Sequence, residues 1–93
     1  MEVKYLITFH PLVTNEDIPR LDTFWRYETR DAIRTKLTTE PELYGKPLRE
    51  SLKGYRSLRI GDYRVVYRIE KRVVKVIAIV HRSGKYKGIE KRM

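Results

Sequence analysis

Arginine side chains recur at strand spacing in the second half of this sequence, within segments otherwise rich in Val, Ile, Leu and Tyr. In a β-strand alternate side chains point to opposite faces of the sheet, so one face can pack on an apolar core while the other carries guanidinium groups. A guanidinium group donates paired hydrogen bonds to phosphate. The spacing therefore predicts a phosphate-binding sheet face between residues 53 and 86. The arginines concerned are Arg56, Arg59, Arg64, Arg68 and Arg82.

Three side chains of this region carry the functional groups that cleavage of an RNA phosphodiester requires. Arg64 lies within a predicted strand on the same face as Asp62 and Val66, Arg82 follows the last strand, and Tyr86 comes four residues later. RNA is cleaved when its 2′-hydroxyl attacks the adjacent phosphorus. This reaction needs a positioned backbone, stabilisation of negative charge and proton transfer to the 5′-oxygen. Arginines meet the first two needs, and no metal is required.

Alternative interpretations of these residues stay open at the level of sequence. Arginine is a poor proton acceptor at neutral pH, whereas a histidine such as His81 is suited to proton transfer. His81 is also a candidate cap for the end of the last strand. Arg64 is also a candidate structural cation, paired with Asp62 or Glu70. The basic stretch 85–92 is either a solvated end or an element that grips RNA.

The sequence lacks the patterns of several other kinds of active site. It contains no P-loop, no GxSxG, no HExxH and no dinucleotide-type glycine pattern. Its histidines are His10 and His81 and it has no cysteine, so we expect neither a metal site nor a small-molecule cofactor. The acidic residues fall mostly in the first half, away from the arginines, which argues against a two-metal nuclease.

The charge of the chain is strongly asymmetric. Lys and Arg number 21 against 12 Asp and Glu, a net charge of +9. Residues 1–44 carry 6 basic and 8 acidic side chains, a net of −2, while residues 45–93 carry 15 basic and 4 acidic, a net of +11. This excess favours a polyanionic partner through steered association and counterion release. The alternative is a solvated basic surface that only aids solubility.

Length and hydropathy predict a single domain over residues 1–93. No apolar run approaches the roughly 18 residues that read as a membrane span, so no membrane segment is expected. The N-terminus has no basic region followed by an apolar core, and there is no signal-peptide pattern. Together with the absence of cysteine, these features favour a cytoplasmic location.

The elements that must position the arginines are predicted by changes of hydrophobic period. Alternation over 3–9 predicts a half-buried first strand, and 11–18 a short helix ended by Pro19. An apolar stripe with Asp22 as N-cap predicts a helix over 22–38. The segment 41–47 is expected to be a loop.

Three strands are predicted in the second half, over 55–60, 62–70 and 73–81. Gly61 and Asp62 form the tight turn between the first two. The last strand is almost continuously aliphatic and is placed inside the sheet. Residues 85–93 are expected to be a basic tail or a short helix. The predicted fold class is therefore α+β: a small, mostly antiparallel sheet of about four strands with two N-terminal helices packed on one face.

Two stretches of the second half resemble one known family. They are KPLRESLKGYRSLRIGDYRVVYRI at 46–69 and VVKVIAIVHRSGKY at 73–86. They are similar to the RelE/ParE toxin superfamily of bacterial and archaeal toxin–antitoxin modules, and the first half agrees more loosely. The resemblance implies a RelE-like fold. For the RelE branch it implies a small ribonuclease that cuts messenger RNA in the ribosomal A site and is inhibited by a cognate antitoxin.

The same resemblance implies roles for individual residues. Arg64 resembles the arginine that stabilises the transition-state phosphate, and Arg82 the arginine that donates a proton or stabilises further charge. Tyr86 resembles the tyrosine that orients or stacks the substrate, and His81 is a candidate base beside them. The implied partners are messenger RNA, ribosomal RNA and the antitoxin. Residues expected to bind RNA are Lys53, Arg56, Arg59, Lys85 and Lys87.

Two other functions are compatible with the sequence. A ParE-like protein of the same superfamily binds and poisons DNA gyrase without cleaving RNA. A nucleic-acid-binding module without catalytic activity would also explain the basic sheet. Retention of Arg64, Arg82 and Tyr86 together favours the ribonuclease.

Overall fold

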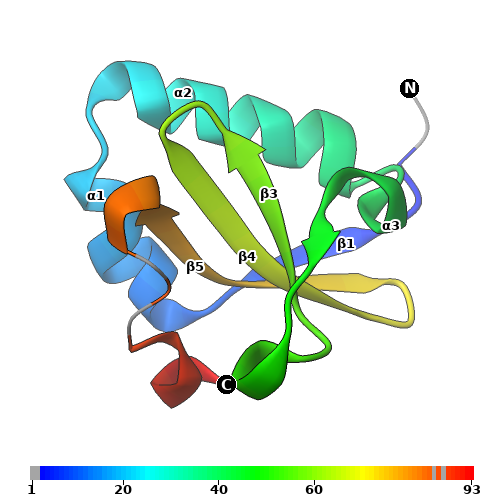
Figure 1. The fold of residues 1–93 in the computed structure, drawn as a ribbon. Helices are drawn as coiled ribbons and strands as arrows, with labels where there is room; N and C mark the ends of the chain where they lie inside the picture. Colours follow the sequence, from blue (N-terminus) through cyan, green and yellow to red (C-terminus); the bar gives the residue numbers. More distant parts are fainter. Residues whose placement is uncertain (1–2, 85, 87) are drawn as a thin grey trace.

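The computed structural model describes residues 3–84, 86 and 88–93 and arranges them around a five-stranded sheet. The strands lie in the order β1-β5-β4-β3-β2 (Figure 1). β1 pairs in parallel with β5, and the other neighbours are antiparallel. The predicted α+β class is confirmed, and the strand beyond the expected four is the short β2. The bounds are β1 (Leu6–Phe9), β2 (Lys46–Pro47), β3 (Arg56–Ile60), β4 (Tyr63–Glu70) and β5 (Val73–His81).

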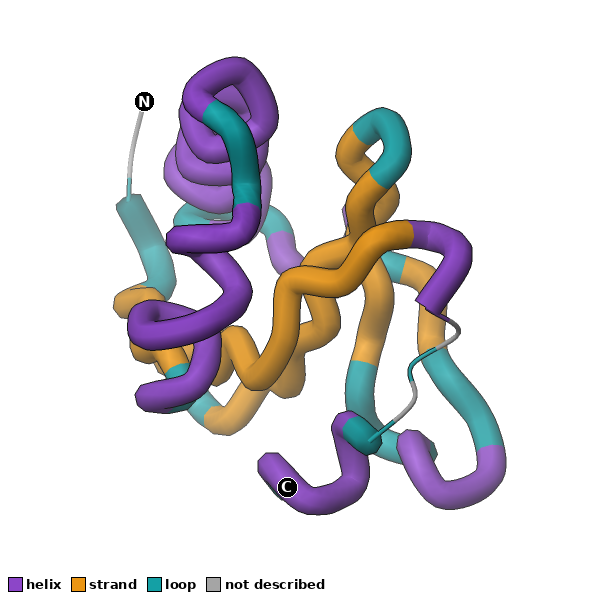
Figure 2. The backbone as a smooth tube through the Cα atoms, turned by 90° about the vertical axis from the view of Figure 1, so that its left-hand side faces the viewer, coloured by secondary structure: helices purple, strands orange, loops and turns teal. Residues whose placement is uncertain are grey.

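The N-terminal helices cover one face of the sheet, as Figures 1 and 2 show. Asp22 caps the longest of them by accepting a hydrogen bond from the Trp25 amide at 3.0 Å, which satisfies a donor left free at a helix start. The helix expected over 22–38 is confirmed as α2 running directly into η2. None of the described helices is long and apolar enough to cross a membrane. The helical segments are η1 (Val13–Asp17), α1 (Ile18–Arg20), α2 (Thr23–Ala32), η2 (Ile33–Leu37) and α3 (Pro41–Tyr44).

Buried side chains form two clusters, one on each face of the sheet. The larger cluster lies under the N-terminal helices and includes Leu37, Val65 and Val74. The smaller cluster includes Val66 and Ile77 and is covered by η3 (Glu50–Leu52) and η5 (Ile89–Arg92) on the other side of the sheet (Figure 2). β5 lies between β1 and β4 and supplies residues to both clusters, which confirms its predicted interior position. The expected short helix near the C-terminus is η5.

Two predicted boundaries in the first half are wrong. Pro19 does not end the first helix, because the helical run that includes η1 continues through α1 to Arg20, and Leu21 is the first extended residue. The segment 41–47 is not a plain loop, since Pro41 starts α3. The Tyr67 hydroxyl donates to the Pro41 carbonyl at 2.6 Å and Arg56 donates to the Gly45 carbonyl at 2.8 Å. These long-range contacts fix the segment, and no local sequence pattern reports them.

An ion pair between Asp17 and Arg92 satisfies backbone groups at the free edge of β5. β1 ends opposite Val76, so the next residues of β5 have no strand on that side. There the Ile79 amide donates to Asp17 at 2.9 Å, and Arg92 donates to the Ile77 carbonyl at 3.0 Å and to Asp17 at 2.6 Å. Buried backbone groups at a sheet edge need such partners. Within the basic stretch 85–92, Arg92 is therefore a structural residue.

Candidate nucleic-acid interface

Arg59 of β3 and Arg64 of β4 face each other directly across two antiparallel strands. Arg64 shares its strand face with Val66, which belongs to the cluster on the sheet face away from α2. Both guanidinium groups therefore project from that face, where Arg59 is exposed and Arg64 half-buried. Like charges placed directly opposite destabilise a sheet. An anion bound between them would relieve that repulsion.

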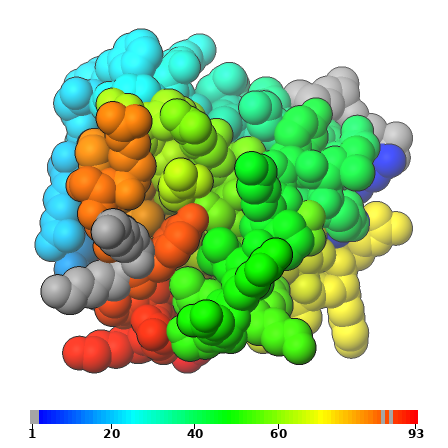
Figure 3. Space-filling model, viewed as in Figure 1, coloured from blue at the N-terminus to red at the C-terminus, as the bar shows by residue number. Residues whose placement is uncertain are grey.

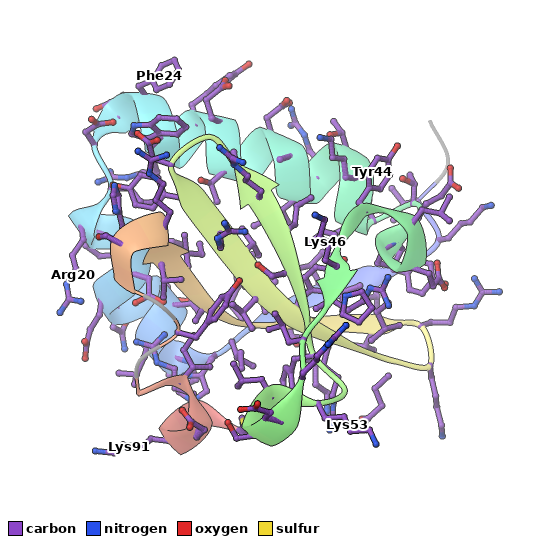
Figure 4. All side chains as sticks on the ribbon, in the orientation of Figure 1. Arg20, Phe24, Tyr44, Lys46, Lys53 and Lys91 are labelled. Carbon is purple, nitrogen blue, oxygen red and sulfur yellow. The ribbon has the colours of Figure 1, made fainter. Side chains whose placement is uncertain are left out.

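β2 adds a lysine to the same face. Lys46 pairs with Ser57 across the β2–β3 ladder, and directly opposed residues point to the same side of a sheet. Ser57 in turn shares its face with Arg59. Lys46 is exposed beside β2 in Figure 4. Sequence reasoning missed this residue because a strand of two residues has no alternation to detect.

Arg82 lies just beyond the end of β5, next to Arg64. Val80 is opposite Arg64, and the Arg82 amide donates to the Asp62 carbonyl at 2.8 Å, which continues the ladder. The Arg82 Nε atom is 3.8 Å from Asp62 Oδ1, with side chains 59% and 50% exposed. An ion pair as exposed as this one contributes little to stability, so the Arg82 guanidinium remains available to bind a ligand. We define the basic face as Lys46, Arg59, Arg64 and Arg82.

The ion pairs of the sheet argue against a purely structural role for Arg64. Its two candidate partners are engaged elsewhere, since Asp62 is beside Arg82 and Glu70 pairs with Arg68 at 2.5 Å and Lys75 at 2.9 Å. Among the residues that the structure describes, no carboxylate forms an ion pair with Arg64.

Tyr86 reaches the basic face from the C-terminal segment. Its hydroxyl donates to Ser57 Oγ at 2.9 Å, and its ring packs on the smaller cluster. Its backbone lies in the left-handed region, with φ of 60°, which is uncommon for a residue with a side chain and is often found at functional positions. The structure thus places Tyr86 on the same face as Arg59 and Arg64.

The sheet between these residues is open to solvent. In Figure 3 the yellow-green atoms of β3 and β4 are visible between the orange end of β5 and the green segment around β2. No helix covers this part of the face in Figure 1. An extended polymer can therefore lie across the basic face.

His81 lies on the other side of the sheet. It is opposite Tyr63 in the ladder, and Tyr63 packs against the cluster under the helices. The two rings meet edge to face with centroids 5.2 Å apart. The Ser83 amide donates to His81 Nδ1 at 3.3 Å. The structure therefore does not bring His81 together with Arg64, and His81 does take part in capping the strand end.

Two other predicted RNA-binding residues lie apart from the basic face. The Arg56 guanidinium donates to the carbonyls of Glu42 and Gly45 at 2.6 and 2.8 Å, on the helix side of the sheet. Lys53 projects from the turn before β3, at the opposite end from Gly61, and Figure 4 shows it far from the end of β5. Lys85 and Lys87 lie outside the described residues.

The described part of the chain, 3–84, 86 and 88–93, contains no group of three or more His, Cys, Asp or Glu side chains arranged to hold a metal ion. The groups gathered at the basic face are instead guanidinium, ammonium and hydroxyl groups. They are suited to binding phosphate and to stabilising negative charge that develops on it.

Comparisons with known proteins agree on one family. Residues 16–86 match the family model described as ParE toxin of type II toxin-antitoxin system, parDE. The chain is 47% identical over 53 residues to Toxin RelE of Mycobacterium tuberculosis, a match that spans 55% of this chain and 55% of that protein. The chain thus spans about half the length of this curated relative.

Solved structures with the same fold include two toxins. One is in the toxin–antitoxin complex RelBE2 from Mycobacterium tuberculosis, with a TM-score of 0.79 and 31% identity over 85% of this chain and 99% of that chain. Another is the YoeB/ParE toxin from Agrobacterium tumefaciens, with a TM-score of 0.59 and 28% identity over 84% of this chain and 96% of that chain.

The fold of this chain matches those of the RelBE2 chain and of the YoeB/ParE toxin. The family match covers well over half of the chain, and the predicted resemblance is confirmed. The chain belongs to the ParE toxin family of type II toxin–antitoxin systems, within the RelE/ParE superfamily.

Proposed function

We propose that this protein is the toxin of a type II toxin–antitoxin module and that it is a metal-independent endoribonuclease, which cuts messenger RNA in the ribosomal A site. The observation that carries the proposal is the placement of Arg59 and Arg64 directly opposite each other on an open sheet face. Two like charges side by side cost stability, and a phosphodiester bound between them offsets that cost. Similarity to Toxin RelE of Mycobacterium tuberculosis supports the same function.

In this proposal the RNA backbone lies across the basic face. The 2′-hydroxyl attacks the adjacent phosphorus and loses its proton to water, the bond from phosphorus to the 5′-oxygen breaks, and the 5′-oxygen takes a proton from water as it leaves. Arg59 and Arg64 stabilise the negative charge that develops on the phosphoryl oxygens. Arg82 acts at the end of the sheet as a further charge stabiliser, because a guanidinium keeps its proton at neutral pH. The Tyr86 hydroxyl, held over β3 by Ser57, positions the nucleotide.

The test is a reconstituted translation reaction in which cleavage of the message is mapped by primer extension. Arg64→Ala and Arg82→Ala should each slow cleavage by about 100-fold or more, which is the cost of removing one donor to a transition-state oxyanion. Arg34→Ala is the matched control. It removes an exposed arginine of η2 whose only described ion pair is a loose one to Asp31 at 3.6 Å, and should leave cleavage unchanged.

Stability provides a second readout of the same variants. Because Arg64 faces Arg59, Arg64→Ala should leave the free energy of unfolding unchanged or raise it by about 0.2–1 kcal/mol, as expected for removal of a cross-strand like-charge pair. Loss of cleavage without loss of stability supports the proposal. If the Arg64→Ala variant cleaves the message at the wild-type rate, the proposal is contradicted.

A second candidate is a ParE-like inhibitor of DNA gyrase, which the matched family model favours. Expression of the toxin in cells separates the two functions. The ribonuclease should stop growth and cut translated messages with codon periodicity. Intact messages together with gyrase-dependent DNA breaks would establish the gyrase inhibitor instead.

The proposed partner in the resting state is a cognate antitoxin. The matching RelBE2 toxin was solved as a toxin–antitoxin complex. This chain leaves large apolar side chains exposed, among them Leu43 at 72% and Leu6 at 69%. An antitoxin consisting of a helix and an extended piece would cover such surface and neutralise the basic face. Gel filtration of the chain with the protein encoded by the adjacent gene should give a shifted peak, and separate elution would contradict the pairing.

A further inference from the structure

A cavity of about 480 Å³ opens beside the end of β5, along the free edge of that strand. α1 borders it on one side and the C-terminal segment on the other, and Figure 1 shows the end of β5 next to α1. The size falls within the range of small-molecule sites. Its lining includes Asp17, Arg20, Tyr63, Ile79, His81 and Arg92.

Aromatic rings that pack against one another form one wall of the cavity. His81 and Tyr63 meet edge to face at 5.2 Å, and Tyr63 contacts Trp25 at 5.4 Å. Tyr63 and Trp25 pack against the cluster under the helices, whereas the His81 ring is exposed. An exposed ring supported from behind by other aromatic rings is a stacking platform for a nucleobase.

The backbone of β5 supplies hydrogen-bonding groups at the same place. The Ile79 amide points away from β4, because it donates to Asp17 at 2.9 Å. The Arg82 amide points toward β4, since it donates to Asp62. Antiparallel strands alternate these directions, so the His81 amide and the Ile79 carbonyl both face the free edge. β1 pairs with β5 only as far as Val76, so neither group has a strand partner on that side among the described residues.

Charge at the cavity favours an anionic ligand. The Asp17 carboxylate in its wall is neutralised by Arg92 at 2.6 and 3.1 Å. Arg20 is 74% exposed and only loosely paired with Glu16 at 3.4 Å, a pair of little energetic value. Figure 4 shows Arg20 extending outward from α1. Its guanidinium can therefore bind a phosphate beside the cavity.

We infer that this cavity is a nucleotide subsite for the RNA strand that crosses the basic face. Arg82 of the basic face and His81 of the cavity are consecutive residues, so a strand bound at Arg82 passes the cavity entrance. A flanking base would stack on His81 and hydrogen-bond to the edge of β5, while Arg20 would hold its phosphate. The inference rests on the proposed function, because it requires RNA on the basic face.

Binding of single-stranded RNA to the whole protein tests the subsite. The probes are hexanucleotides of each base with 2′-O-methyl groups, which cannot be cleaved by 2′-hydroxyl attack, and binding is followed by fluorescence anisotropy. His81→Ala should weaken binding by roughly five- to 150-fold, the range expected for one base–aromatic stacking contact. His81→Phe should retain most of the affinity because it keeps the ring. Arg20→Ala should weaken binding, and the matched surface control Arg34→Ala should not.

A direct readout comes from the same titration. Trp25 is the single tryptophan of the chain and contacts Tyr63, so its fluorescence should change as the subsite fills. If Arg64→Ala weakens RNA binding while His81→Ala and Arg20→Ala leave it unchanged, the subsite is contradicted and the proposed function still stands. If no RNA binds the wild-type protein, or if Arg64→Ala has no effect, the RNA-binding basic face and the subsite both fail.

Discussion

The buried ion pair of Asp17 and Arg92 should make Arg92 one of the most important residues for stability. Arg92 donates to both Asp17 oxygens, at 2.6 and 3.1 Å, and to the Ile77 carbonyl at 3.0 Å. The two side chains are only 4% and 14% exposed. Arg92→Ala would leave Asp17 buried with the Ile79 amide as its remaining donor, and would also leave the Ile77 carbonyl without a partner.

The magnitude follows from that geometry. Removing one partner of a buried ion pair costs about 3–5 kcal/mol. Asp17 keeps one hydrogen bond, so we expect the lower limit, about 3 kcal/mol. Small domains are stable by only about 5–15 kcal/mol, so this loss is large.

The assay is urea unfolding followed by Trp25 fluorescence. The control is Arg34→Ala, whose ion pair with Asp31 is 70% and 45% exposed and should contribute less than about 1 kcal/mol. In a double-mutant cycle, Asp17→Asn combined with Arg92→Ala should cost less than the sum of the single changes, because each single change already breaks the pair. Additive effects, or an Arg92→Ala loss no greater than the control, would refute the reasoning.

Two further predictions concern the sheet. A hydrogen bond from Lys75, the charge of Lys75 and the nearby Arg68 guanidinium hold the pKa of Glu70 below its usual value. The Glu70 carboxylate therefore stabilises the folded state above about pH 4–5. This stabilisation is lost as the pH falls through the pKa of Glu70 in the folded state. The stability difference between wild type and Glu70→Gln should therefore be constant near neutrality and shrink on acidification in urea unfolding; a difference independent of pH contradicts this. Gly61 has φ of 57°, and an added Cβ would collide with the Trp25 ring, so Gly61→Ala should cost more than about 1 kcal/mol. Gly84→Ala, where a Cβ meets nothing within 4 Å, should be nearly neutral, and equal thermal midpoints for the two variants would count against the close contact.

The strands of the second half could be predicted because their signals are local. Alternation over 62–70 and the turn at Gly61 depend on residues a few positions apart, and β3, β4 and β5 match their predicted bounds within one residue. The same alternation put Arg64 and Val66 on one face, as the structure has them. Arg56 and Arg59 were both predicted to bind RNA, although their opposite parity in β3 places them on opposite faces of the sheet.

Other features depend on contacts that no local pattern reports. Pro41 starts a helix that is held by Tyr67, a residue 26 positions away. His81 was expected beside the arginines, but the register of β4 and β5 sets it opposite Tyr63 on the other face. The structural role of Arg92 depends on Asp17, 75 positions earlier.

The sequence by itself determined which side chains share a strand face, because the two-residue period of a strand is a property of its own backbone. It also determined the excess of positive charge and the family resemblance. The tertiary structure alone decided which strands are neighbours and in what register, and therefore that Lys46, Arg59, Arg64 and Arg82 form one basic face. Register is set by packing between distant segments, so it enters only when the chain has folded.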